Sequence, residues 1–326
     1  MNNSVQFTGI TNRIAKIYKN NRDIFPVYFA AIALFIVAGI VSKDLLRVNS
    51  LITIFRLSTF LMILGLGQGL VILTGGIDLS VPWAMTTAGI LLSTLSLGND
   101  AALWWVIPVI LVFGALLGFI NGFGITVLEI SPIVMTIASN VIVRGITLVA
   151  INGTPKGYTP PSITYLMSGH MFGWLPPIFI IVAVLYIAAM LILTKTKYGR
   201  YIYAIGNNSH VSFLSGVQVN KILILVYVLA GLLSAFGGIM LTGYSTLAFV
   251  NMGDPYLLPS IATVVVGGAA IVGGKGKPLG TLGGALMLTI LSTILTALLM
   301  PAAIREILYG VVILIAVFIS RDKNNN

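Results

Sequence analysis

The sequence has no cysteine and very little charge. Of its 326 residues only two are histidine and 8% are charged, whereas 58% are hydrophobic. The absence of cysteine excludes disulfides, thiolate metal sites and a cysteine nucleophile. The two histidines, His170 and His210, both fall in expected loops, so we expect no His-rich metal site and no His-based catalytic triad within a membrane.

The common motifs of hydrolases and ATPases are also missing. The sequence contains neither H-E-x-x-H nor G-x-S-x-G. The run Gly273-Gly274-Lys275-Gly276-Lys277 resembles a phosphate-binding loop, but it lacks the first glycine and the Ser or Thr that a Walker A motif requires. We therefore expect a chain that is not an enzyme, needs no metal or other cofactor, and does not hydrolyse ATP by itself.

The low charge instead indicates a membrane protein. Soluble proteins have about a quarter of their residues charged, and the mean hydropathy here is +1.05. A membrane-spanning helix needs about 20 mostly apolar residues. On this rule the sequence predicts an all-α polytopic membrane protein with about ten transmembrane helices. These spans are 25–42, 51–74, 80–97, 102–125, 132–151, 174–194, 221–243, 256–272, 278–299 and 303–320.

Lysine and arginine predict the orientation, because cytoplasmic segments carry the excess of positive charge. With the N-terminus inside, twelve of the 18 Lys and Arg residues fall in cytoplasmic segments, four fall outside, and Arg56 and Arg144 lie within spans. We therefore expect a basic cytoplasmic N-terminal tail (1–24), a single transmembrane domain (25–320) and a cytoplasmic C-terminal tail (321–326). The net charge of +10 reflects this topology, so no nucleic-acid partner is expected.

A polar break interrupts an apolar run in the stretch VILTGGIDLSVPW, residues 71–83. The pair Gly75-Gly76 lets the backbone leave a helix, Asp78 or Ser80 can cap the next helix, and Pro82 falls in its first turn. Within a bilayer, broken helices usually line a cavity for polar cargo. Asp78 either lies on such a pathway or only caps a helix after a cytoplasmic turn.

Polar residues inside the spans are further candidates for a pathway. Thr136, Asn140, Arg144 and Thr147 recur at spacings of three and four, so they share one helix face. This face should meet protein or water, because an arginine facing lipid costs roughly 2.5–3.5 kcal/mol. The stripe either joins helices or contacts cargo. Asn121 lies among small residues that permit close helix packing and is another candidate.

The longest cytoplasmic segment, 195–220, is too polar to span a membrane and too apolar for a free linker. A short helix over about 209–214 fits these residues, begun by Asn207, Asn208 or Ser209 and ended by Gly216. Exposed apolar side chains here would form a docking surface for another protein. The alternative is a loop packed on its own helix ends.

The order of the spans suggests two related halves. Spans 2–5 begin outside and spans 7–10 begin inside, so the two blocks have opposite topology. Each block has an apolar run that ends in glycines before a small-residue helix, VILTGGIDLS in the first and VVVGGAAIVGGKGKPLG in the second. This pattern is typical of an inverted repeat around a central pathway.

Five stretches together resemble the permease subunits of bacterial ABC importers of the ribose/xylose/arabinose type, and the resemblance covers about residues 50–320. They are VILTGGIDLSV, GALLGFINGFGIT, SPIVMTIASNVIVRGITLV, YGRYIYAIGNN and VVVGGAAIVGGKGKPLGTLGGAL. The chain departs from that family at Pro82-Trp83, where glycine is common. It also departs at Glu129, where a basic residue is frequent, and at His210, where an acidic residue is usual.

The resemblance implies a permease subunit of an ATP-driven importer in the bacterial inner membrane, with a fold similar to the vitamin B12 importer permease. It implies a second permease copy, identical or related, and a periplasmic binding protein that delivers a monosaccharide or related small polar solute. A separate ABC ATPase would dock on segment 195–220. The coupling residues expected there are Tyr198, Gly199, Arg200, Asn207, His210, Phe213, Leu214 and Gly216.

The residues themselves leave one alternative open, an ion-coupled secondary transporter or channel. Such a protein would need acids at mid-depth, whereas Asp78, Glu129, Asp254 and Glu306 fall at or near loops. The candidates for the translocation pathway are Gly75, Gly76, Asp78, Ser80, Asn121, Asn140 and Arg144.

Overall fold

The structure is a computed structural model that describes residues 24–171, 173 and 175–322. The predicted N-terminal tail, apart from Ile24, lies outside the described residues. The same holds for all but the first two residues of the predicted C-terminal tail.

Within the described residues the regular structure is helical, with no strand beyond one isolated bridge between Met171 and Leu175. Three short 3-10 helices accompany the α-helices: η1 (Lys43–Leu46), η2 (Asp100–Ala102) and η3 (Asp254–Tyr256). The α-helices are α2 (Phe25–Val41), α3 (Val48–Leu73), α4 (Val81–Ser96), α5 (Leu103–Thr126), α6 (Pro132–Ala150), α7 (Pro161–Ser168), α8 (Ile178–Lys195), α9 (Lys197–Asn207), α10 (Ser209–Leu214), α11 (Val219–Ser245), α12 (Leu257–Val266), α13 (Pro278–Ala297) and α14 (Ala302–Asp322).

The prediction of an all-α polytopic membrane protein is confirmed. Each predicted span coincides with a helix, and six helical segments of the described chain are long and apolar enough to cross a membrane. These are Val48–Leu73, Asp100–Thr126, Pro132–Ala150, Ile178–Lys195, Val219–Ser245 and Pro278–Ala297. The remaining predicted spans include the shorter helices α2, α4 and α12, so the count of ten spans stays a prediction.

The helix at the eighth predicted span, 256–272, is shorter than expected. Helix α12 ends at Val266, and Gly268 follows with φ +90°, a left-handed conformation that favours glycine. An irregular loop then runs to α13. The glycines therefore end this helix earlier than the apolar run alone indicates.

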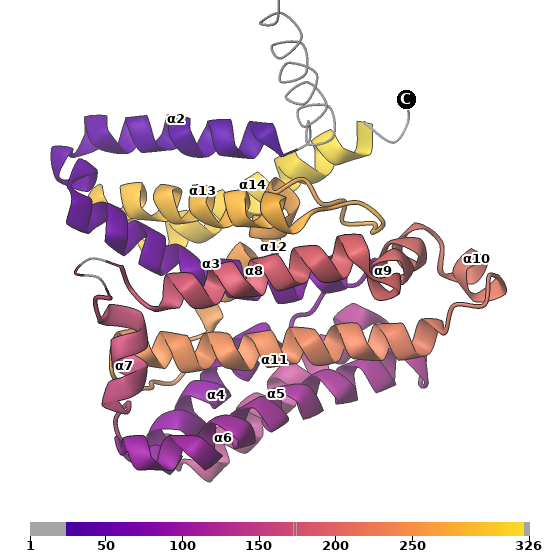
Figure 1. The fold of residues 1–326 in the computed structure, drawn as a ribbon, viewed down its shortest axis with the longest axis horizontal. Coiled ribbons are helices and arrows are strands. Elements are labelled where there is room, and N and C mark those ends of the chain that lie inside the picture. The colour runs from indigo at the N-terminus through magenta and orange to yellow at the C-terminus, as the bar shows by residue number, and fades with distance from the viewer. Residues whose placement is uncertain (1–23, 172, 174, 323–326) are drawn as a thin grey trace, which may run out of the picture.

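The helices lie side by side in layers (Figure 1). Helices α2, α13 and α14 form one edge, α4, α5 and α6 form the opposite edge, and α11 lies against α3, α4 and α5. Helices α5 and α11 approach very closely, because Cβ atoms added at Gly114 or Gly118 would meet the α11 backbone at Gly231 and Tyr227. The small residues of α5 thus permit the close packing that the sequence predicts.

Helices α9 and α10 lie at one end of the bundle, at the right of Figure 1, and α7 lies at the other end. The predicted short helix at 209–214 is confirmed as α10, with the Asn208 side chain accepting from Val211 N at 3.0 Å. Gly216, with φ +83°, follows its C-terminus, as expected. Helix α9 was not predicted. Its side chains Ile202 and Ile205 are buried, so one face of the helix packs against the protein.

Candidate functional site

The break at residues 71–83 has the predicted form. Helix α3 ends at Leu73, Gly75 adopts φ +83°, and α4 begins at Val81 with Pro82 in its first turn. The expected cap differs, however. Neither Asp78 nor Ser80 bonds to the first helical amides through its side chain.

The cap comes instead from another helix. The amide of Trp83, one of the orphan donors at the start of α4, donates to Asn140 Oδ1 of α6 at 3.2 Å. This contact joins residues 57 positions apart, so no local pattern indicated it. Asn140 therefore fixes where α4 begins against α6.

Asp78 is buried, with 1% of its surface exposed, and it holds the break together. Its Oδ1 accepts from the Ser80 amide at 2.8 Å and from the Ser80 hydroxyl at 2.6 Å. With its amide nitrogen facing the Asp78 carbonyl, the Gln68 side chain pairs with both backbone groups of Asp78, at 3.1 and 3.2 Å. These bonds satisfy polar groups that would otherwise be costly to bury.

The hydrogen bonds continue from the break into α5 and α6. Asn121 Nδ2 donates to Ser80 Oγ at 3.0 Å, and the Ser139 hydroxyl donates to Asn121 Oδ1. Both Asn121 and Ser139 are buried. We call Gln68, Asp78, Ser80, Asn121 and Ser139 the inner polar network. It links α3, the break, α5 and α6: Gln68 pairs with the Asp78 backbone, and the other side chains are paired with one another.

The polar stripe of α6 is divided between protein and the surface: Thr136 and Thr147 are buried, Asn140 is half-buried and Arg144 is exposed. Thr147 Oγ1 shares a hydrogen bond with Thr87 Oγ1 of α4 at 2.8 Å. The Arg144 guanidinium lies 5.6 Å from the centre of the Trp83 ring, and the residue is exposed. Trp83 is thus the partner of Arg144, a pairing that the sequence does not reveal.

Two glycine loops and helix α9 meet in one place, which we call the glycine junction (Leu73–Gly75, Gly206 and Gly273–Gly276). Gly274 N donates to Leu73 O at 3.0 Å, and the Tyr203 hydroxyl of α9 donates to Gly276 O at 2.7 Å. A Cβ added at Gly273 would lie 2.8 Å from Gly206 O and 2.9 Å from Gly75 N. Burial raises the pKa of Tyr203 above its usual range.

The coupling residues predicted from the resemblance separate into two groups. Gly199 is buried against α8, and Asn207 Nδ2 donates to Tyr203 O at 3.0 Å within α9. Phe213 and Leu214 are 66% and 70% exposed. Tyr198, Arg200, His210 and Gly216 are exposed as well. Exposed apolar side chains on α10 are what a docking surface would need, and the docking itself stays a prediction.

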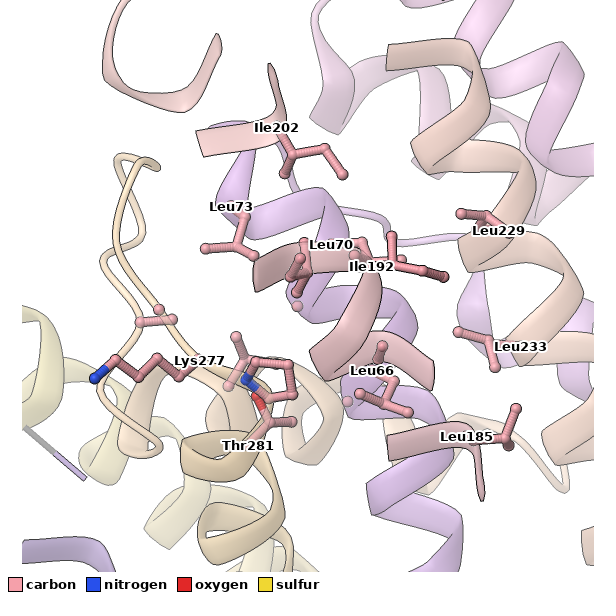
Figure 2. Close-up of a pocket in the computed structure, with 18 of the residues that line it drawn as sticks. Leu66, Leu70, Leu73, Leu185, Ile192, Ile202, Leu229, Leu233, Lys277 and Thr281 are labelled. Atoms are coloured by element: carbon pink, nitrogen blue, oxygen red, sulfur yellow. The ribbon is translucent and has the colours of Figure 1, made fainter. Parts of the chain in front are cut away.

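Two cavities accompany these features. The first, about 280 Å³, lies between α3, α8 and α11 (Figure 2) and is lined by leucine and isoleucine, with Lys277 and Thr281 at one side. The second, about 670 Å³, lies between α3, η3, α12, α13 and α14 and carries hydroxyl and charged side chains. In the described part of the chain, no three His, Cys, Asp or Glu side chains come together as metal ligands.

Long apolar helices, a broken helix and an exposed helical segment at one end define a polytopic membrane protein. Residues 50–317 match the family model described as branched-chain amino acid transport system / permease component. The chain belongs to this permease family.

The relatives of the chain are import permeases. It is 34% identical over 294 residues to the ribose import permease protein RbsC of Haemophilus influenzae, covering 89% of this chain and 90% of the relative. It is 33% identical over 300 residues to RbsC of Bacillus subtilis, with 89% and 90% covered. It is 32% identical over 306 residues to the autoinducer 2 import system permease protein LsrC of Escherichia coli, with 92% and 86% covered. The predicted membership of the sugar ABC importer permeases is confirmed.

No solved structure is significantly similar to this chain. The similarity to the vitamin B12 importer permease therefore stays a prediction.

Proposed function

We propose that this chain is the transmembrane subunit through which an ATP-driven importer moves a monosaccharide or related small polar solute. The relatives support this proposal, because their names assign them to ribose and autoinducer 2 import. Within the structure, the glycine junction is the observation that best supports the proposal. There a surface helix contacts the ends of two broken helical segments, so movement at the surface can reach both halves of the bundle.

An ABC ATPase docks on α9 and α10 in this proposal. Phe213 and Leu214 supply an exposed apolar contact, and the coupling residues around them complete the surface. Because Tyr203 of α9 bonds to Gly276, and Gly274 bonds to Leu73, a displaced α9 shifts both glycine loops. The loops in turn lead directly into α4 and α13, which transmit the displacement across the bundle.

In the membrane, the chain spans the bilayer about ten times with both termini in the cytoplasm. A helix in each predicted span and the distribution of Lys and Arg support this topology. A second permease copy, identical or related, completes the pathway, and the fold resembles that of the vitamin B12 importer permease. A periplasmic binding protein delivers the solute, and ATP is hydrolysed by the separate ATPase subunit.

The predicted pathway residues take two roles in this proposal. Asn140 and Arg144, which are not fully buried, face the pathway along α6. Gly75, Gly76, Asp78, Ser80 and Asn121 shape the wall behind them, because their hydrogen bonds and backbone turn set the position of the break.

Reconstitution tests the function directly. The chain is placed in liposomes with its ATPase and binding protein, and accumulation of D-ribose, D-xylose and L-arabinose is measured. We expect ATP-dependent accumulation by the complete importer and no accumulation by the chain alone. Accumulation by the chain alone under an ion gradient would instead show an ion-coupled secondary transporter.

The docking surface is tested by the double substitution Phe213→Ala and Leu214→Ala. Buried apolar anchors at the centre of an interface contribute about 2 kcal/mol or more, so recovery of the ATPase with the purified permease should fall by at least about tenfold. Tyr158→Ala is the control, because Tyr158 is 71% exposed and lies just before α7, at the end of the bundle away from α10. Equal ATPase recovery with the unaltered chain, the double variant and the Tyr158→Ala control would contradict docking on α10.

A further inference from the structure

The 670 Å³ cavity, which we call the outer cavity, lies at the end of the bundle opposite the glycine junction. Helix α13 connects the two regions: it begins at Pro278, just after the junction, and its 20 residues extend for about 30 Å. The cavity is lined by the last turns of α13, the first turns of α14, and η3. In the proposed topology this end of the molecule faces the periplasm.

One wall of the outer cavity is a stripe of hydroxyl groups on α13. Thr289, Ser292, Thr293 and Thr296 follow one another at spacings of three, one and three, so they share a helix face. The Thr293 hydroxyl donates to Thr289 O and the Thr296 hydroxyl donates to Ser292 O, both at 2.8 Å. Because the hydroxyl protons are used within the helix, each of these two oxygens can only accept, and it keeps at least one lone pair for a solute even where Thr296 already accepts from Arg305.

The opposite wall offers donors and charges of both signs. Among the described residues, the charged side chains on the cavity wall are Arg305 and Glu306 of α14, one of each sign. Arg305 donates to Thr296 Oγ1 at 3.2 Å and has further N–H groups that can donate. Balanced charges beside a row of hydroxyls suit a neutral molecule with many hydroxyl groups better than an ion.

The remaining surface of the cavity is apolar and aromatic. Phe249, Met252 and Tyr256 lie on it, and the Tyr256 ring is held edge to face against Phe60, with 5.9 Å between ring centres. Small-molecule sites commonly have about 300–1,000 Å³ and combine an apolar lining with a few placed polar groups. The 280 Å³ cavity of Figure 2 lacks such a set of hydroxyl groups.

We propose that the outer cavity receives the imported solute, a neutral polyhydroxylated molecule of monosaccharide size, through Thr293, Thr296 and Arg305. This assignment rests on the proposed function and adds the residues that first contact the solute after its delivery.

Uptake by the complete importer in proteoliposomes tests the assignment. In the double variant Thr293→Val and Thr296→Val, two acceptors are lost while the shape of the wall is kept. Uptake of the transported sugar at subsaturating concentration should fall about tenfold. The Thr293→Ser and Thr296→Ser double variant should retain uptake. Thr126→Val is the matched control, because its hydroxyl donates to Gly122 O at 2.8 Å on α5, outside the cavity.

Thiol labelling tests access to the cavity independently of transport. Since the chain has no cysteine, Thr293→Cys introduces a single thiol in the permease of the complete importer. A small, charged, membrane-impermeant thiol reagent added outside should label it, and it should not label the Thr126→Cys control.

The outcomes separate this assignment from the proposed function. If the unaltered importer accumulates none of the three sugars with ATP, the proposed function and the assignment both fail. If it accumulates a sugar, but the valine variants transport normally or the Thr293→Cys thiol is unreachable from outside, only the assignment fails.

Discussion

The inner polar network and the outer cavity contain similar side chains in opposite surroundings. In the network, Asp78, Ser80 and Asn121 are each at most 2% exposed, and their polar atoms pair with one another. In the outer cavity, Thr293, Thr296 and Arg305 line about 670 Å³ of open volume. Accessibility therefore separates polar residues that hold the structure together from those that, in our proposal, meet a solute.

The physical reason lies in the cost of burial. A buried polar group must find a partner within the protein, and once paired it has little capacity left for a passing molecule. The network residues meet this requirement across three helices and the break. The hydroxyls of Thr293 and Thr296 meet it by donating to their own helix backbone, which leaves each oxygen with at least one lone pair that can accept.

The largest effect is expected where the helices around the network pack most closely. Gly118→Val places a side chain against the backbone of α11 at Tyr227 and Val228, which cannot move aside, and should cost about 3 kcal/mol or more. We expect loss of monodisperse protein in size-exclusion chromatography. Gly310→Val is the control, because a Cβ there would meet no atom within 4 Å. Similar behaviour of the two variants would contradict the close packing of α5 on α11.

The next largest effect tests the network itself. Asn121→Ala leaves Ser80 and Ser139 without a shared partner, which should destabilise the fold by about 1–3 kcal/mol. The measurement is the midpoint of thermal unfolding in detergent, with the exposed Asn49→Ala as the control. An unchanged midpoint would show that these hydrogen bonds do not contribute to the stability of the fold.

Arg305→Gln should impair transport without lowering stability, the reverse of what is expected of a network residue. We expect uptake by the complete importer to fall about tenfold while the unfolding midpoint stays within experimental error, because Arg305 contacts an open cavity. Arg47→Gln serves as the control, since Arg47 pairs with Asp44 at 2.9 Å on the exposed surface, where such pairs contribute about 0–1 kcal/mol. If Arg305→Gln destabilises the protein as much as Asn121→Ala does, the contrast between the two regions is wrong.

The smallest effect on uptake is expected at Arg144, which is exposed on α6 beside the Trp83 ring. Arg144→Gln removes a cation–π contact with Trp83, which contributes about 0.5–1 kcal/mol. If Arg144 faces the pathway, uptake should fall severalfold although the unfolding midpoint barely shifts. Arg144→Lys keeps a positive charge near the ring, so its uptake should lie between that of the unaltered protein and that of Arg144→Gln. Normal uptake by Arg144→Gln would remove Arg144 from the pathway.

Local patterns predicted much of this site. Gly75 and Pro82 indicated the break because glycine permits a left-handed backbone and proline is tolerated in the first helical turn. The short helix α10 followed from Asn208 and Gly216 for similar reasons. The hydroxyl stripe of α13 was visible in the sequence as well. Hydroxyl side chains are common in membrane-spanning helices and mark a site less clearly than ionisable ones, so only the helical spacing of these residues could have indicated a shared face.

The sequence alone determined the membrane environment, the helices and the position of the break, because these depend on hydrophobicity, backbone preference and spacing along one segment. Only the tertiary structure decided which helix caps α4, which loops meet α9 and which polar residues stay accessible. Those properties depend on contacts between residues far apart in the chain, such as Trp83 with Asn140 and Leu73 with Gly274, which no local pattern encodes.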